Sequence, residues 1–267
     1  MESILDKTYK RLAIQVSLNG LSFAVVNTIT EQIEVLQPLP YHPYQRNTPI
    51  EDWFTVVFHD HPELRLRYDA IQIVHTNALN TFVPTPFFDA EFKGSYLQFN
   101  TRVFETDFFA YDTLASHEMT NVYIPYVNMN NFFIDQYGSF DYCHAHSILV
   151  QKLLEYSKHS VEPVMYVHRA ASHFEIVVIA QRKLVYFNAF DYQTPEDFIY
   201  YILFTAEQLQ LNPEQLQLEL LGTFEEDDPF YQMAYTYIRQ VQLMPLRAIN
   251  NGRSEHENRH HFILVHA

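Results

Sequence analysis

Glycine, cysteine and basic residues are scarce in this 267-residue chain, and each scarcity excludes a class of protein. The single cysteine, Cys143, excludes an internal disulfide, and we expect a reducing compartment. The 17 Lys and Arg residues are outnumbered by 32 Asp and Glu residues, which gives a net charge of −15, and no basic run occurs. Because nucleic acid and anionic membranes bind basic surfaces, we expect neither as a partner.

Long apolar segments are also missing. No stretch is long and apolar enough to span a membrane, and residues 1–16 lack the apolar core of a signal peptide. We therefore expect a cytoplasmic protein with no membrane insertion. Hydrophobic residues make up 48% of the chain, enough for the core of one large domain or two modest ones. Many of the 22 Phe and 19 Tyr residues are expected in the core, and a surplus would leave an aromatic surface for a partner protein.

The scarcity of glycine excludes the common phosphate-binding loops. Such loops need closely spaced glycines, so that backbone N–H groups converge on the anion. Neither GxGxxG nor GxxxxGK[ST] occurs, which excludes dinucleotide-binding and P-loop proteins. The five glycines are far apart: Gly20, Gly94, Gly138, Gly222 and Gly252.

An internal duplication is the main feature that is present. Residues 12–36 and 165–187 align at an offset of 151, so that Phe23 falls on Phe174 and Leu36 on Phe187. Each segment predicts three successive antiparallel strands. In the first copy Asn19–Gly20 predicts a tight hairpin with left-handed backbone angles.

The order of the following elements repeats too. Helix starts are predicted at 48–54 (TPIEDWF) and 194–198 (TPEDF), and apolar strands at 70–76 and 217–223. The chain is therefore predicted to be α/β, with two tandem β-β-β-α-β-α domains, 1–160 and 161–267, joined through a helix at 147–160. Further predicted elements are helices over 86–99, 128–138, 147–157 and 228–240, strands over 120–127, 139–146, 241–248 and 260–267, and a polar loop over 247–259.

Two such domains, each opening on a three-strand meander, resemble the actin-like ATPase (ribonuclease H-like) fold of sugar kinases, heat-shock ATPases and actin. The chain also looks like an uncharacterised bacterial family of about this length with that fold. The resemblance implies an Asp and glycines in the first hairpin that bind phosphate and metal. It also implies an Asp-x-Gly pattern in the second hairpin and a Gly-Gly pair against adenosine.

The sequence departs from this pattern at each motif. Ser17 replaces the first Asp, while Asn19–Gly20 keeps the turn. The second hairpin has His168, Arg169 and Ala170, and the third motif keeps only Gly222, followed by Thr223. Because Mg²⁺ with a triphosphate needs a nearby carboxylate, these losses predict a protein without metal-dependent phosphoryl transfer.

The sequence thus predicts a non-catalytic module that binds or scaffolds an unknown protein partner and needs no cofactor. Weak nucleotide or anion binding in an interdomain cleft is part of this hypothesis, and self-association is left open. The cleft residues would be Ser17, Asn19, Gly20, His168, Arg169 and Gly222.

Two enzymatic alternatives stay open. In an active nucleotide-dependent phosphotransferase or ATPase, Asp60, Asp69 or the acidic run 225–228 would replace the missing carboxylates. In a zinc-dependent hydrolase the metal would be held by histidine pairs at 59/61, 144/146 or 260/261, with His144 and His146 on one face of a strand. Cys143 is predicted to be a buried, inert thiol.

Overall fold

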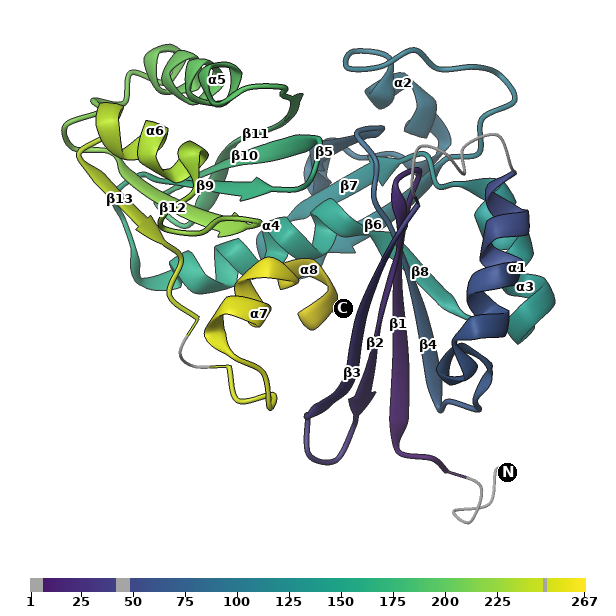
Figure 1. Ribbon diagram of the computed structural model, residues 1–267. Helices are drawn as coiled ribbons and strands as arrows, with labels where there is room; N and C mark the ends of the chain where they lie inside the picture. The colour runs from purple at the N-terminus through teal and green to yellow at the C-terminus, as the bar shows by residue number, and fades with distance from the viewer. Residues whose placement is uncertain (1–6, 42–48, 247–248) are drawn as a thin grey trace. The chain divides into compact units, whose positions relative to one another are not determined.

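The computed structural model describes residues 7–41, 49–246 and 249–267 (Figure 1). The chain divides into two compact units. Unit 1 comprises Met1–Ile148, Asn250–Arg253 and Ile263–Ala267, and unit 2 comprises Leu149–Ile249 and Ser254–Phe262. The predicted boundary at 160/161 lies further along the chain. Among the described residues, no helix has the length and apolar character needed to cross a membrane.

Unit 1 is built on a five-stranded sheet with the order β3-β2-β1-β4-β8. β1, β2 and β3 form the predicted antiparallel meander, whereas β1, β4 and β8 are parallel. α1 and α3 pack on one face of the sheet, where Phe54 and Phe133 are fully buried (Figure 1). Thr48, part of the predicted start of α1, lies outside the described residues. The bounds are β1 (Lys10–Ser17), β2 (Gly20–Asn27), β3 (Ile33–Pro40), α1 (Ile50–Asp60), η3 (Pro62–Arg65), β4 (Ala70–His75), α3 (Val127–Tyr137) and β8 (Asp141–His144).

A small subdomain, here called the insertion (residues 80–123), interrupts unit 1 between β4 and α3. It contains a three-stranded antiparallel sheet with the order β5-β7-β6, and β5 and β6 were not among the predicted elements. The helix predicted over 86–99 is wrong except for α2, because Pro86 and Gly94 favour short 3₁₀ turns and a single α-helical turn. The bounds are β5 (Asn80–Pro84), η4 (Thr85–Phe87), η5 (Ala90–Phe92), α2 (Lys93–Leu97), β6 (Ala110–Leu114), η6 (Ala115–His117) and β7 (Met119–Tyr123).

Unit 2 repeats the plan with the sheet order β11-β10-β9-β12-β13. α5 begins where predicted, with Pro195 in its first turn and a capping box between Thr194 and Asp197. α5 and α6 lie over one face of this sheet (Figure 1), and their side chains, including Phe198 and Ala234, are part of the core cluster of unit 2. The bounds are β9 (Val164–Arg169), β10 (His173–Ala180), β11 (Lys183–Asp191), α5 (Pro195–Gln208), β12 (Gln217–Gly222), α6 (Pro229–Tyr237) and β13 (Gln240–Leu243); α4 (Ala145–Tyr156) and η7 (Ser157–His159) precede them.

The two sheets confirm the predicted duplication, because their strands have the same order: third, second, first, fourth, fifth. The correspondence extends to an irregularity in the second strand of each sheet. A β-bulge lies between Val25 and Val26 in β2, and another lies between Val178 and Ile179 in β10. Both hairpins therefore bend at the same place in the repeated plan.

The hydrogen-bond register corrects the predicted alignment of the first two strands. Ile14 pairs with Phe23 in unit 1, and Val167 pairs with Ile176 in unit 2, which rules out a shared offset of 151 for both strands. The bulges after Val25 and Val178 then set the offset at 153. The predicted match of Phe23 with Phe174 is therefore wrong by two residues. The third strand does keep the offset of 151 and the match of Leu36 with Phe187. Leu36 pairs with Ala24 and Phe187 pairs with Val177, and these two partners are 153 residues apart.

The corrected register changes which residues correspond at the ends of β1 and β9. The Val16 carbonyl accepts a hydrogen bond from the Thr76 N–H, and the Arg169 carbonyl accepts one from the Thr223 N–H, at 2.9 Å in both cases. Val16 therefore corresponds to Arg169. Ser17 corresponds to Ala170, and not to His168 as the sequence alignment implied.

The C-terminal residues form helices, which contradicts two predictions. α7 (Glu255–His260) overlaps the end of the predicted loop over 247–259, of which residues 247 and 248 are outside the described chain. α8 (Phe262–Val265) replaces the predicted terminal strand. A capping box between Ser254 and Glu257 starts α7, and the guanidinium of Arg11 donates to the carbonyl oxygen of Ala267 in unit 1.

Candidate functional site

In unit 1 the predicted residues Ser17, Asn19 and Gly20 form the turn between β1 and β2. The Ser17 hydroxyl accepts a hydrogen bond from the Asn19 N–H at 3.1 Å and thereby closes the turn locally. The predicted left-handed backbone is wrong for Asn19, since only Gly20 of this pair has a positive φ, +150°. A Cβ at Gly20 would lie 2.5 Å from the carbonyl oxygen of Leu39. The approach of β3 thus explains this glycine without any phosphate.

In unit 2 the predicted residue Gly222 ends β12 beside the last residue of β9, Arg169. Its φ is +90°, and a Cβ there would lie 2.1 Å from the Arg169 carbonyl oxygen and 2.9 Å from its amide nitrogen. Every other residue type would collide with the neighbouring backbone. The close packing of two parallel strands is therefore sufficient to require a glycine at position 222.

The side chain of Arg169 is buried within unit 2, where its terminal nitrogens are bonded and its Nε has no hydrogen-bond partner among the described residues. Its guanidinium pairs with Asp228, the N-cap of α6, and donates to the carbonyl oxygen of Thr223. The guanidinium carbon also lies 4.5 Å from the ring centre of Phe224 and 4.2 Å from that of Phe230. The guanidinium of Arg169, which was predicted to bind an anion, thus contacts two aromatic faces and one carboxylate of unit 2.

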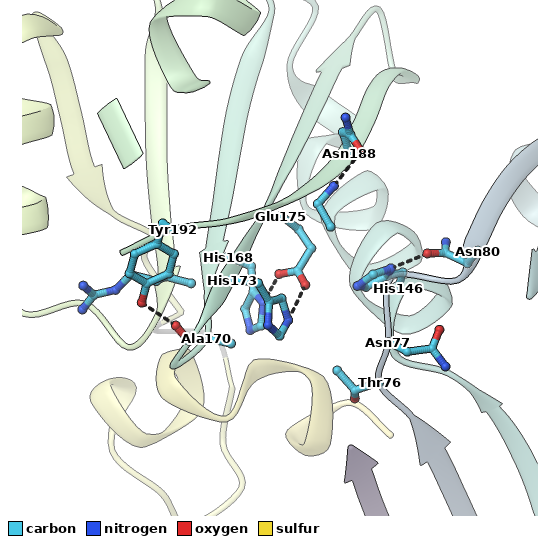
Figure 2. Close-up of polar contacts among 12 residues, drawn as sticks. Thr76, Asn77, Asn80, His146, His168, Ala170, His173, Glu175, Asn188 and Tyr192 are labelled. Atoms are coloured by element: carbon cyan, nitrogen blue, oxygen red, sulfur yellow. Dashed lines mark hydrogen bonds and ion pairs between the residues drawn. The ribbon is translucent and has the colours of Figure 1, made fainter. Parts of the chain in front are cut away.

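His168 belongs to a second buried group in unit 2, centred on Glu175 (Figure 2). One carboxylate oxygen of Glu175 lies 2.8 Å from Nδ1 of His168, and the other lies 3.1 Å from Nε2 of His173. Burial lowers the pKa of His173, but the hydrogen bond and negative charge of Glu175 outweigh it, so the pKa is raised. Near the same strands the Tyr192 hydroxyl donates to the carbonyl of Ala170 at 2.7 Å.

The carboxyl ends of the parallel strands in unit 1 carry a polar cluster that the sequence did not predict. His75, the last residue of β4, is fully buried. Its Nε2 lies 2.9 Å from the side-chain oxygen of Asn130, and its Nδ1 accepts from the Tyr126 N–H. Burial lowers the pKa of His75 to about 4, although the bond to Asn130 opposes this. Both ring nitrogens thus suit a neutral imidazole protonated on Nε2.

A chain of hydrogen bonds also joins the insertion to the first turn of α4. Nδ1 of His146 donates to Asn80 at 2.8 Å (Figure 2). The Asn80 amide donates to Asn121, and the Asn121 amide donates to Ser147, each at 2.9 Å. The Ser147 hydroxyl donates to Asp112 at 2.5 Å. This series of bonds holds all three strands of the insertion against α4.

Asp112 is the carboxylate at the end of that chain. Besides the Ser147 hydroxyl, it accepts the Tyr123 hydroxyl at 3.0 Å and the His144 N–H at 2.8 Å. Burial raises the pKa of Asp112, and the three hydrogen bonds oppose this rise. Asp112 and Glu175 are the acids that sequence reasoning missed. Both serve as acceptors for groups of the protein itself, which is a structural use of a buried carboxylate.

The acids proposed for the phosphotransferase alternative have other roles. The Asp69 carboxylate accepts hydrogen bonds from the backbone N–H groups of Thr8 and Tyr9. Asp69 precedes the first residue of β4, and Ser17 is the last residue of the parallel strand β1, so the two residues lie at opposite ends of the strands. Asp60 ends α1 and pairs with the exposed His59. In the acidic run 225–228, Glu225 contacts His256, and Asp228 pairs with Arg169.

The histidine pair 144/146 proposed for zinc does not have the predicted geometry. His144 ends β8 and His146 lies in α4, so they do not share a strand face; their rings bond to Asn77 and Asn80. His260 and His261 lie at the end of α7. Over residues 7–41, 49–246 and 249–267, no three His, Cys, Asp or Glu side chains are placed to hold a metal ion.

The insertion exposes aromatic side chains around a small core cluster, whose buried members are Val83, Leu97 and Val122. Between α2 and the loop 103–109 lies a cavity of about 330 Å³, here called the insertion pocket, with Phe92 and Phe104 among its lining residues. Five phenylalanines are at least half exposed: Phe87 (76%), Phe92 (59%), Phe99 (89%), Phe104 (50%) and Phe108 (52%). Exposed aromatic groups of this density are typical of protein interfaces.

Comparison with known proteins identifies the family and the fold. The model of the family "Protein of unknown function (DUF3822)" matches residues 2–241, and no curated protein matches the sequence. A solved Bacteroides thetaiotaomicron protein with an actin-like ATPase fold and unknown function has a TM-score of 0.80 at 22% identity, covering 91% of this chain and 94% of that chain. The PilM-PilN type IV pilus biogenesis complex has a TM-score of 0.57 at 13% identity, covering 96% of each chain. The predicted actin-like ATPase fold is thereby confirmed.

Proposed function

We propose a protein-binding role without phosphoryl transfer for this chain, which belongs to the DUF3822 family and has an actin-like ATPase fold. The exposed phenylalanines of the insertion carry the proposal. In this reading the two-unit frame is retained as a scaffold, and the insertion supplies the docking surface.

The internal use of the nucleotide-motif positions supports the absence of phosphoryl transfer. Ser17 closes its own turn, and Arg169 is held by Asp228 and two aromatic rings. A site for Mg²⁺ and a triphosphate needs a carboxylate with free oxygen lone pairs at the metal. The buried carboxylates of Asp112 and Glu175 already accept hydrogen bonds from neighbouring side chains.

The hydrogen-bonded attachment of the insertion supports a docking role. Asn80, Asn121 and Asp112 lie on its three strands and all bond, directly or through one another, to the first turn of α4. A surface held in this way is ordered before a partner arrives, so that less conformational entropy is lost on binding. The PilM-PilN complex is a protein assembly that includes this fold, which makes a binding role a reasonable use of it.

The test is a crosslinking capture from cells that produce the chain naturally. The variant Phe92→Ser/Phe104→Ser is compared with Phe204→Ser, which removes an aromatic side chain from α5 that is 45% exposed. We expect the wild-type chain and Phe204→Ser to retain the same partner and the double variant to lose it, with circular dichroism unchanged. A partner retained by the double variant would contradict the proposal, and so would phosphate release from ATP by the purified chain.

A further inference from the structure

The insertion pocket has the dimensions of a receptor for one large side chain. Its volume of about 330 Å³ is at the lower end for ligand pockets, which start at about 300 Å³. Phe92 contributes one lining side chain from η5, and Phe104 contributes one from the loop 103–109. The ring of Phe109 lies against Gly94, where an added Cβ would approach it to 3.1 Å. An apolar side chain entering here would be in contact with aromatic rings.

Two carboxylates line the pocket without a partner of their own. Glu91 and Glu105 both line it, and neither side chain has a hydrogen bond or ion pair with any described residue. The other acids nearby are different. Asp89 accepts the Glu91 N–H at 2.9 Å, and Asp107 accepts the Phe104 N–H at 2.8 Å. Of these four neighbouring acids, Glu91 and Glu105 are therefore the two whose side chains lack a described partner.

Two cations lie in the same segment, each over an aromatic ring, and of the two only Lys93 is among the lining residues of the pocket. Nζ of Lys93 is 5.7 Å from the ring centre of Tyr111. The guanidinium carbon of Arg102 is 4.8 Å from the ring centre of Phe104. The lining residues thus combine aromatic rings with two carboxylates against one ammonium, which leaves a net negative charge, here called the negative rim, on a chain whose net charge is −15. Such a field steers positively charged partners toward the surface.

We infer that the insertion pocket binds a basic segment of a partner protein. The segment places one large apolar side chain between Phe92 and Phe104, with Lys or Arg side chains beside Glu91 and Glu105. This inference rests on the proposed protein-binding role and specifies the chemistry of the partner. The negative rim and the net charge of −15 disfavour a second copy of this chain and an anionic membrane as the occupant.

The test is selection of a displayed random 16-residue peptide library against the full chain. The best peptides are then measured by fluorescence anisotropy against three variants. Glu91→Lys/Glu105→Lys reverses the rim, and Ser95→Leu fills the pocket. Asp135→Lys/Glu214→Lys is the matched control, because it makes the same change of charge at two exposed carboxylates without partners among the described residues. Phe104→Ser replaces Ser95→Leu if the latter does not fold.

We expect enriched peptides to carry an aromatic, Leu or Met residue flanked by Lys or Arg. Rim reversal should weaken them about tenfold, pocket filling should abolish binding, and the control should change affinity only slightly. Affinity should also fall as the salt concentration rises. Peptides that lose binding to the pocket-filling variant but carry no positive charge would overturn this inference and leave the proposed function standing. Failure to enrich any peptide, or enrichment of peptides indifferent to the pocket variants, would overturn the inference as well.

Discussion

The pair of Arg169 and Asp228 gives the sharpest test of how unit 2 uses the second nucleotide motif. Both side chains are largely buried, and the guanidinium lies between Phe224 and Phe230. The perturbation is Asp228→Ala. It removes the only carboxylate paired with the guanidinium among the described residues, and it removes the N-cap of α6, whose side chain accepts the Phe230 N–H.

The magnitude follows from these contacts. Loss of one partner from a buried ion pair costs about 3–5 kcal/mol, and loss of an Asp N-cap costs about 1 kcal/mol. Since the Asp228 side chain keeps 15% of its exposure, we take about 3 kcal/mol, the lower end of the range, for the ion pair. With about 1 kcal/mol for the N-cap, we expect a loss of about 4 kcal/mol in the free energy of unfolding. Arg169→Met keeps an apolar side chain between the rings and should cost about 2 kcal/mol.

The double variant shows whether the losses in unfolding free energy of the two single variants simply add. In Arg169→Met/Asp228→Ala no buried charge lacks a partner, so we expect it to be more stable than Asp228→Ala alone by about 1–2 kcal/mol. The assay is urea unfolding followed by circular dichroism, with the slope of the transition compared among variants. A cost below about 1 kcal/mol for Asp228→Ala, or a double variant no more stable than that single variant, would refute the assignment.

Three further predictions follow from single residues. Because the pKa of His75 is lowered to about 4 in the folded chain, the unfolded chain binds more protons below pH 6.5, and stability should fall between pH 6.5 and 4. His75→Gln should flatten this part of a plot of urea midpoint against pH. An unchanged slope would contradict the burial of the imidazole. Gly222→Ala should lower the free energy of unfolding by about 3 kcal/mol, because its Cβ would meet the backbone of Arg169; a thermal melt unchanged from wild type would exclude that contact. Burial raises the pKa of the Cys143 thiol to about 12, so iodoacetamide at pH 8 should label it only after unfolding, and rapid labelling of the native chain would contradict this.

The repeated order of elements could be predicted from the sequence, but the register of the hairpins could not. Side chains in a strand alternate between faces with a period of two, so a shift of two residues leaves every apolar residue on the same face. Matching Phe23 to Phe174 instead of Ile176 is therefore invisible in the pattern of hydrophobic residues. Only the hydrogen bonds between strands distinguish an offset of 151 from one of 153.

The C-terminal helices had a signal that the sequence analysis overlooked. Ser254 and Glu257 form a capping box, whose spacing is visible in the sequence and marks a helix start. The run of apolar residues that follows is too short for periodicity to separate a strand from a helix. The end of β8 was misassigned for a similar reason: His144 and His146 fit an alternating strand, but α4 begins at Ala145.

The buried acids of the site had no local signal at all. Asp112 bonds to His144 and Ser147, which are 32 and 35 residues away in the sequence, through the packing of the insertion on α4. The insertion itself was missed because β5 and β6 are five-residue strands in a segment rich in aromatic residues. The surplus of aromatic residues was nevertheless the observation that predicted an exposed aromatic surface, which the phenylalanines of this segment confirm.

The most direct test of the account is thermal unfolding of the purified chain with ATP and Mg²⁺, with Mg²⁺ alone as the reference. Ligand at 10 mM that binds the native state with a Kd of 1 mM would add about 1.4 kcal/mol, or about 4 °C in Tm. The account predicts a rise below about 1 °C, because the motif positions are occupied by the protein's own contacts. A saturable rise of several degrees that Ser17→Arg abolishes would contradict it and show a working nucleotide site.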